Sequence, residues 1–454
     1  MNINKGLLCF LILFSLSLGA NANFTGKWEG KLAIRPNMAL RLVLNVSNED
    51  SGNYTVTMDS PDQGAYGIAT NVIYMGTDSI NIAVPMLKVN YTGSLSNDTI
   101  TGIFSQGGLK MPLSLVRVDT SLKRPQTPVP PFPYTSAEIA FPSALDGQML
   151  YGTITLPEGA NHNTPFAIFI SGSGTQNRDE EIFGHKPFAV IADYLARNGI
   201  AALRYDDRGY DVRLGIAPNQ TSKENSLDAL GAIKYLQNNG YNRIGLIGHS
   251  EGALIADMLG AKDDDNIIKF VVEIGGPAVA GDKILLYQNQ IALNDEDIPE
   301  EVTSMYLTAL KGVFDSQKED VASTFIESEY EIFSDKWRNN PVVQTLAANI
   351  KKNLLSLPPW IKYYINYNPI DDIKKLKMPV FFIYGEKDTQ VPAELNLPIL
   401  NKEIPSANIK IYPELNHCMQ HALTGRVSEY EKIEETFSPV VLQDIVDFIL
   451  SSQQ

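Results

Sequence analysis

Between residues 24 and 118, apolar and polar residues partly alternate in short runs that are rich in β-branched side chains. Leu40–Val46, Tyr54–Thr57 and Ile80–Val84 are three such runs, and turn-forming residues such as 51–53 separate them. A period of two places one face of a strand against a core. The pattern therefore predicts a small all-β N-terminal domain over residues 23–118, built as a barrel or a sandwich.

A proline-rich stretch follows this region. Five prolines fall between positions 125 and 133, where they remove backbone donors and favour extended polyproline conformation. We predict that residues 119–136 form a semi-rigid linker between two domains.

From about Ala137 onward, apolar strand-like runs alternate with stretches of helical periodicity. Strands that are apolar on both faces are typical of a mainly parallel sheet with helices on both sides, so residues 137–454 are predicted to form an α/β domain. The expected strands are 151–156, 166–170, 201–205, 243–247, 267–274, 380–384 and 409–412, and the expected helices include 188–198, 226–239 and 439–450.

The alternation breaks between about Ala278 and Lys377, after the expected strand at 267–274. This region is helical in pattern, acidic and rich in aromatic residues, among them Trp337 and Trp360. An insertion at this place predicts a helical cap, over about 278–377, that acts as a lid.

The first 22 residues have the pattern of a secretory signal peptide. Lys5 precedes an apolar segment over 6–18, and Ala20-Asn21-Ala22 offers a small-residue cleavage site. Cleavage near Ala22 would export the chain to the periplasm or the medium; an uncleaved anchor is the alternative. No later stretch is long and apolar enough to span a membrane, and export would leave Cys418 as the only cysteine.

The net charge is −15, and removal of Lys5 with the leader leaves 36 basic and 52 acidic residues, or −16. Nucleic-acid binding relies on Lys and Arg, so this charge excludes nucleic acid as the expected partner.

The strongest chemical signal is the pentapeptide from Gly248 to Gly252, with Ser250 at its centre. It fits Gly-x-Ser-x-Gly between an apolar strand and a helix, the context of a nucleophile elbow. The neighbouring glycines remove side chains that would clash at the turn, and the helix N-terminus favours an oxyanion. Ser250 is therefore the candidate nucleophile. His249 adjoins it and is expected to point elsewhere in a supporting role.

A serine hydroxyl needs a base, which in this arrangement follows the nucleophile and an acid along the chain. His417 lies after the strand-like run 409–412 and before the last helix, which makes it the candidate base. His421 is the alternative.

The acid should follow the strand at 380–384. Asp388 is the candidate that would orient the imidazole, with Glu386 as a local alternative and Glu273, near the end of the preceding strand, as a topological one.

An oxyanion hole needs two backbone donors. The N–H of Glu251, directly after the nucleophile, is one candidate. The other should come from the Gly-rich loop after the strand 166–170, where Ser173 is the first choice and Gly174 the next. This chemistry requires no metal or cofactor, and a packing role is expected for Cys418.

From about Phe141 to the C-terminus, the chain resembles the α/β-hydrolases, and specifically a bacterial carboxylesterase group close to the serine aminopeptidase-like hydrolases. The motifs that carry this resemblance are, in chain order, Asp146-Gly147, Gly152–Pro157, Ser171–Gly174, Asn177–Asp179, Arg204–Gly209, Gly248–Gly252, Pro359-Trp360, Tyr367–Pro369, Gly385–Asp388, Gln390–Pro392 and Leu415–His417.

The resemblance implies an α/β-hydrolase fold, a triad of Ser250, Asp388 and His417, hydrolysis of small-molecule carboxylic esters, and a cap formed by the insertion. The chain departs from the family at Ser171-Gly172, where His-Gly is usual. Two rival functions stay open. One is a peptidase or amidase with the same triad. The other is a non-catalytic binding protein that uses the β-domain, whose Gly26-Lys27-Trp28 is similar to the Gly-x-Trp of lipocalin-like barrels.

Overall fold

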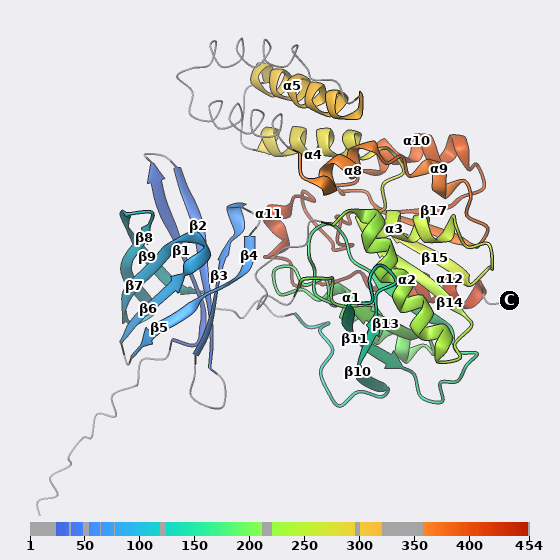
Figure 1. Ribbon diagram of the computed structural model, residues 1–454, viewed down its shortest axis with the longest axis horizontal. Coiled ribbons are helices and arrows are strands. Elements are labelled where there is room, and N and C mark those ends of the chain that lie inside the picture. Colours follow the sequence, from blue (N-terminus) through green and yellow to red (C-terminus); the bar gives the residue numbers. More distant parts are fainter. Residues whose placement is uncertain are drawn as a thin grey trace, which may run out of the picture. The chain divides into compact units, whose positions relative to one another are not determined.

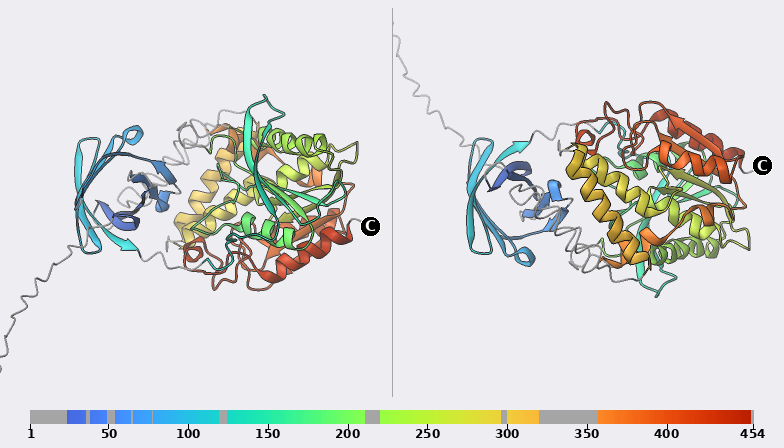
Figure 2. Two further views of the ribbon diagram at one scale, coloured as in Figure 1. Left: turned by 90° about the horizontal axis from the view of Figure 1, so that it is seen from below. Right: turned by 90° about the horizontal axis from the view of Figure 1, so that it is seen from above.

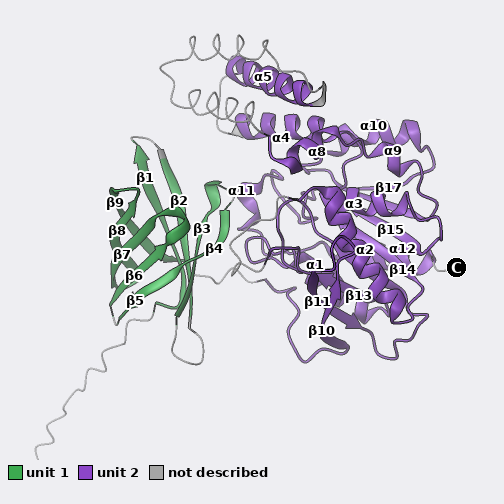
Figure 3. Cartoon of the chain, in the orientation of Figure 1, with its two compact units in different colours: residues 1–121 green, residues 122–454 purple. Residues whose placement is uncertain are grey.

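The computed structural model describes residues 24–35, 38–48, 54–63, 65–76, 78–118, 124–210, 220–295, 300–319 and 357–452. The predicted signal peptide therefore lies outside the described residues, as does Trp337. The chain divides into two compact units, residues 1–121 and 122–454 (Figure 3).

The first unit is a nine-stranded antiparallel sheet, in the order β4-β3-β2-β1-β9-β8-β7-β6-β5, that curls until it is nearly closed (Figure 1). Three of its strands contain the alternating runs noted in the sequence. The strands are β1 (Gly26–Arg35), β2 (Met38–Asn48), β3 (Tyr54–Ser60), β4 (Ala65–Ala69), β5 (Asn71–Met75), β6 (Ser79–Val84), β7 (Val89–Ser96), β8 (Thr99–Gln106) and β9 (Leu109–Val118).

Side chains fill the inside of this sheet. Trp28 is fully buried, and its indole N–H donates to the Phe24 carbonyl at 2.7 Å. The buried Tyr91 hydroxyl donates to the carbonyl of Leu113 at 3.1 Å. Both polar atoms are paired, so the apolar interior carries no desolvation penalty from them.

The second unit is built on an eight-stranded sheet in the order β10-β11-β13-β12-β14-β15-β16-β17. β10 and β11 are antiparallel to their neighbours, and the other strands run parallel. The strands are β10 (Thr135–Pro142), β11 (Met149–Leu156), β12 (Phe166–Ile170), β13 (Ala201–Tyr205), β14 (Ile244–His249), β15 (Ile268–Ile274), β16 (Val380–Gly385) and β17 (Asn408–Tyr412).

Helices cover both faces of this sheet (Figure 1, Figure 2). The apolar sides of α1 (Pro187–Arg197) and α12 (Pro439–Ser451) pack in one core. Those of α2 (Ser222–Asn238) and α3 (Glu251–Gly260) pack in the core on the other side. Two cores on one central sheet are the arrangement that apolar parallel strands require.

Strand β10 was not predicted from the sequence, and its first two residues fall within the predicted linker. It lies at the sheet edge, and its first four residues are exposed. It therefore shows no alternation of apolar and polar residues. The residues before β10 also pack against the rest of the second unit, to which they belong. Arg124 donates to the carbonyls of Phe183, Glu431 and Ile433 at 2.8–2.9 Å.

Helical elements occupy the described part of the insertion, namely α4 (Gly281–Asp295), α5 (Glu300–Glu319), α8 (Pro359–Asn366) and α9 (Ile370–Ile373). The first three share an apolar core that includes Leu293, Val313 and Ile365. α10 (Ala393–Glu403) and α11 (Val427–Tyr430) complete the unit. None of the described helices combines the length and the apolar character needed to cross a bilayer.

Two carboxyl groups, from Asp257 on α3 and Glu273 on β15, are buried beside each other, and among the described residues neither has a hydrogen-bond partner outside the pair. Burial raises the pKa of both groups, and the charge of Asp257 raises that of Glu273 further. Ionisation of this pair is therefore unfavourable in the folded chain.

A raised pKa in the folded state means that the proton binds more tightly there than in the unfolded chain. The stability that the protonated pair provides is present at acid pH and is lost as pH rises through the folded-state pKa. We expect Asp257→Asn to stabilise the protein at pH 8 relative to the wild type, by about 1 kcal/mol or more, which is the equivalent of one pKa unit. At pH 5 the difference should be smaller, because less of this stability has been lost there. Thermal unfolding at both pH values measures it. The exposed Asp265→Asn is the control, and an equal effect at both pH values would contradict the expectation.

Candidate active site

Ser250 lies on a sharp turn between β14 and α3 with a strained backbone, at φ 53° and ψ −119°. The flanking glycines make this turn possible. A Cβ at Gly248 would lie 2.3 Å from the carbonyl oxygen of Gly252, and a Cβ at Gly252 would lie 2.0 Å from that of Ile170. Strain that the surroundings over-determine in this way is typical of functional sites. The turn has the geometry of a nucleophile elbow.

His417 and Asp388 meet beyond the ends of β17 and β16. His417 Nδ1 lies 2.7 Å from Asp388 Oδ2, and both side chains are buried. The other carboxylate oxygen of Asp388 accepts the N–H groups of Gln390 and Val391, each at 2.8 Å. Burial acts to raise the pKa of Asp388, but His417 and these backbone donors outweigh it and leave the pKa below its usual value. An ionised Asp388 fixes the proton of His417 on Nδ1 and leaves Nε2 as the free nitrogen.

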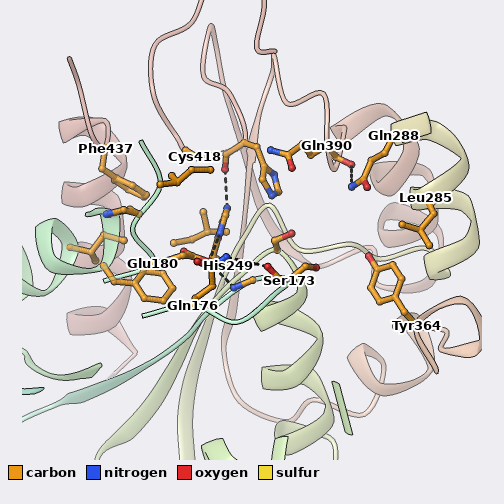
Figure 4. A pocket seen from close by; sticks show the side chains of 18 of the residues that line it. Ser173, Gln176, Glu180, His249, Leu285, Gln288, Tyr364, Gln390, Cys418 and Phe437 are labelled. Atoms are coloured by element: carbon orange, nitrogen blue, oxygen red, sulfur yellow. Dashed lines mark hydrogen bonds and ion pairs between the residues drawn. The ribbon is translucent and has the colours of Figure 1, made fainter. Parts of the chain in front are cut away.

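Ser250 and His417 line one pocket of about 250 Å³ (Figure 4). No hydrogen bond joins them, which is common where catalytic contacts tighten only around a bound substrate. Phe437 and Cys418 lie on one side of the pocket, and Leu285, Gln288 and Tyr364 lie on the other (Figure 4). The described lining residues are Gly172, Ser173, Gln176, Glu180, Ile182, Pro187, Phe188, Ile191, His249, Ser250, Ile274, Leu285, Gln288, Trp360, Tyr364, Gln390, His417, Cys418 and Phe437.

Of the two backbone groups predicted to hold an oxyanion, the N–H of Glu251 directly follows Ser250. Glu251 is the first residue of α3, where an N–H has no partner within the helix. Ser173 lines the pocket, whereas Gly174 is not among the described lining residues. The N–H of Gly172 is engaged, since it donates to Glu180 Oε1 at 2.6 Å.

Asp207 holds the loop that carries Ser173. Its carboxylate accepts the Ser171 hydroxyl at 2.7 Å and the Gln176 N–H at 2.8 Å, so both ends of the loop are fixed to one side chain. Arg178 in turn pairs with Asp206 at 2.6 Å. Ser171, which departs from the usual His, is thus a structural anchor for this loop.

His249 links the elbow to the segment that carries His417. Its Nδ1 lies 2.9 Å from Glu180 Oε1 and its Nε2 lies 3.1 Å from the carbonyl oxygen of His417. Two acceptors on the two ring nitrogens fit the protonated imidazole, which donates from both. Burial acts to lower the pKa of His249, but the Glu180 carboxylate outweighs it, and the pKa is raised above 6.5.

The structure does not bring the alternative residues into the pocket. His421 is exposed and its Nδ1 lies 2.7 Å from Glu435. Glu386 is exposed and accepts the N–H of Glu414 at 3.0 Å. Glu273 faces Asp257. Cys418 lines the pocket, but burial raises the pKa of its thiol, which therefore stays neutral.

Sequence reasoning missed the roles of Glu180, Asp207 and Ser222, all of them polar and mostly buried. The sequence contains one indirect sign that the regions of Glu180 and Asp207 lie together. The motifs Asn177–Asp179 and Arg204–Gly209 carry opposite charges, and in the structure these charges pair as Arg178–Asp206 and Arg204–Asp179.

The pairing of Glu180 with His249 has a measurable consequence. Because its folded-state pKa is raised, the charged His249 contributes stability that is present below pH 6.5 and is lost as pH rises through the folded-state value. We expect Glu180→Gln to lower the pKa of His249, because the effect of burial is then opposed only by the His417 carbonyl and the charge of Asp388. The loss of stability should be larger at pH 6 than at pH 9.

The titration of the His249 ring, followed by NMR, measures this pKa, and thermal unfolding at the two pH values measures the stability. Glu181→Gln, an exposed neighbour, is the matched control. An unchanged midpoint in Glu180→Gln would show that Glu180 does not set the charge of His249.

The chain matches no protein-family model. It is 27% identical over 277 residues to the esterase EstD of Thermotoga maritima, an alignment that covers 60% of this chain and 58% of EstD. The chain thus spans less than two thirds of that relative. Among solved structures, an esterase from Pyrococcus furiosus aligns with 16% identity and a TM-score of 0.43, over 71% of this chain and 92% of the other. A proline iminopeptidase from Mycobacterium smegmatis aligns with 16% identity and a TM-score of 0.41, over 70% and 100%.

The sequence match to EstD and the topology of the second unit agree. The second unit is a mostly parallel sheet with helices on both faces. A strained serine lies between its fifth strand in chain order and the following helix, and an acid and a histidine lie on later loops. The second unit thus has the topology of the α/β-hydrolase fold, and the sequence of the chain is similar to that of a known esterase.

Proposed function

We propose that this protein is a serine hydrolase that cleaves carboxylic esters through an acyl-enzyme. The observation that carries the proposal is the strained Ser250 in a pocket that it shares with His417, whose other ring nitrogen is held by the buried Asp388. The similarity to the esterase EstD supports the choice of an ester.

In the first half of the reaction, Ser250 Oγ attacks the carbonyl carbon while Nε2 of His417 takes the hydroxyl proton. The N–H groups of Glu251 and Ser173 hold the negative oxygen of the tetrahedral intermediate. When the intermediate collapses, the bond to the alcohol oxygen breaks and His417 gives its proton to that oxygen. The acyl group stays on Ser250.

Water completes the cycle. His417 takes a proton from the water as it attacks the acyl carbon, and then returns that proton to Ser250 Oγ as the acid leaves. Asp388 stays ionised throughout and stabilises the imidazolium that forms twice in each cycle.

The wall of the pocket indicates an uncharged substrate. Its described part has apolar side chains such as Phe188, Ile191 and Phe437 on one side, and no lysine or arginine. α4 and α8 add Leu285, Gln288, Trp360 and Tyr364, so we propose that the insertion acts as the cap that the sequence predicts.

The peptidase alternative needs a group to hold a charged chain end. Glu180 is the only carboxylate among the described lining residues, and its Oε1 already binds His249 and the Gly172 N–H. This commitment favours esters over peptides with a free amino terminus. A non-catalytic role would leave the strained elbow without a purpose.

We also propose that the protein acts outside the cytoplasm, in the periplasm or the medium. This proposal is supported by the sequence pattern of residues 1–22. The cysteine that would remain, Cys418, is buried.

Ser250→Ala tests the function directly. Loss of the nucleophile should lower kcat for p-nitrophenyl butyrate by several orders of magnitude, on the scale of about 10⁶-fold seen when a triad serine is removed. A fluorophosphonate probe should label the wild type and not the variant. The exposed Ser136→Ala on β10 is the control and should keep both properties. Ester hydrolysis near the wild-type rate in Ser250→Ala would refute the assignment.

A further inference from the structure

Glu251 carries a buried carboxyl group directly after Ser250. The residue is 2% exposed, and among the described residues its partners are neutral donors, with no lysine or arginine. A carboxylate in such a place is costly unless hydrogen bonds replace its water. Three neutral donors do so. They are the Ser173 hydroxyl at 2.8 Å, the Ser222 hydroxyl at 2.6 Å, and the Trp360 indole N–H at 2.8 and 2.9 Å from the two carboxylate oxygens.

These donors come from three separate parts of the unit. Ser173 belongs to the loop after β12, Ser222 begins α2, and Trp360 lies on α8 at the C-terminal end of the insertion. Bonds to an ionised acceptor are about twice as strong as neutral ones. Glu251 therefore fixes the positions of all three segments at a point directly beside Ser250.

The bond to Ser173 bears on the oxyanion hole. One of the two proposed donors is the N–H of Glu251 itself, and the other is the N–H of Ser173. Because the Ser173 hydroxyl is bound to the Glu251 side chain, the same residue supplies one donor and orients the peptide of the other.

The bond to Trp360 bears on the pocket wall. The Trp360 ring stacks on Tyr364, with centroids 5.4 Å apart and 15° between the ring planes, and both residues line the pocket. The carboxylate accepts the indole N–H with both of its oxygens, so it fixes the aromatic wall as well as the loop.

We propose that the Glu251 carboxylate is a positioning group that couples the wall formed by α8 to the oxyanion hole. This inference rests on the proposed function, since it assigns a task within the ester-cleaving site. The carboxylate touches no reacting atom. It acts through Ser173 on the transition state and through Trp360 on substrate binding.

Two single variants separate these effects. Ser173→Ala keeps the backbone N–H but removes the anchor, so it should lower kcat by about 10- to 100-fold, short of the loss of a whole oxyanion donor, with little change in KM. Trp360→Phe keeps an aromatic ring but removes the N–H, so it should raise KM several-fold with a smaller change in kcat.

Glu251→Gln should change both constants. A neutral amide accepts more weakly than a carboxylate, so the bond from the Ser173 hydroxyl weakens. It also places an NH₂ group where a second acceptor is needed, so the Trp360 N–H loses one of its two acceptors. A trifluoromethyl ketone, which adds to Ser250 and forms an oxyanion, should bind Ser173→Ala and Glu251→Gln at least tenfold more weakly. A change that only loosens the fold would not weaken this inhibitor selectively over KM.

A double-mutant cycle completes the test, with p-nitrophenyl butyrate as substrate. If Ser173 acts through Glu251, Ser173→Ala should cost little more kcat in the Glu251→Gln background, because the anchor is already impaired. The exposed Glu158→Gln is the matched control for the Glu-to-Gln change. Thermal unfolding shows whether each variant folds. If Glu251→Gln does not fold, the inference is tested by whether Ser173→Ala lowers mainly kcat while Trp360→Phe raises mainly KM.

Wild-type kcat and inhibitor affinity in Ser173→Ala and Glu251→Gln would overturn the inference. So would additive effects in the cycle. In either case, fluorophosphonate labelling of Ser250 and an inactive Ser250→Ala would show that the proposed function itself still stands.

Discussion

The close approach of α3 to the loop after β12 is the constraint on which the site depends. Gly252 lies so near the Ile170 carbonyl that no side chain fits between them. This approach forces Ser250 into its strained conformation, turns its side chain into the pocket, and sets the N–H of Glu251 beside it. The strain is a local cost of about 1–3 kcal/mol, and the two large cores on either side of the sheet offset it.

Around this turn, the acidic side chains of Asp207 and Glu180 are hydrogen-bonded to neighbouring groups. Asp207 fixes the loop of Ser173, Glu180 fixes His249, and His249 fixes the carbonyl of the residue that we propose as base. Glu180 is buried, Asp207 is partly buried, and each is paired by hydrogen bonds. Buried polar groups that are fully paired make a site rigid, and a rigid site needs no reorganisation as charge develops.

The sequence was sufficient for the parts of the fold that depend on local pattern. The strands at 166–170 and 201–205 coincide with β12 and β13, and the serine turn could be placed because its motif stands between a strand and a helix. β10 was missed because an exposed edge strand has no apolar alternation. The environment of Glu251 could not be predicted, since its partners lie 29 to 109 residues away and only the tertiary fold brings them together.

The proline-rich segment has a consequence for dissecting the molecule. Its prolines suggest a place where the two units could be cut apart. Arg124 and Gln126, however, bind main-chain groups at 183 and 431–437, and Phe437 forms part of the pocket wall. A fragment that starts at residue 137 would strip these groups of their partners. The shortest fragment that keeps these contacts should therefore begin no later than residue 124, and the domain boundary lies before the proline-rich segment.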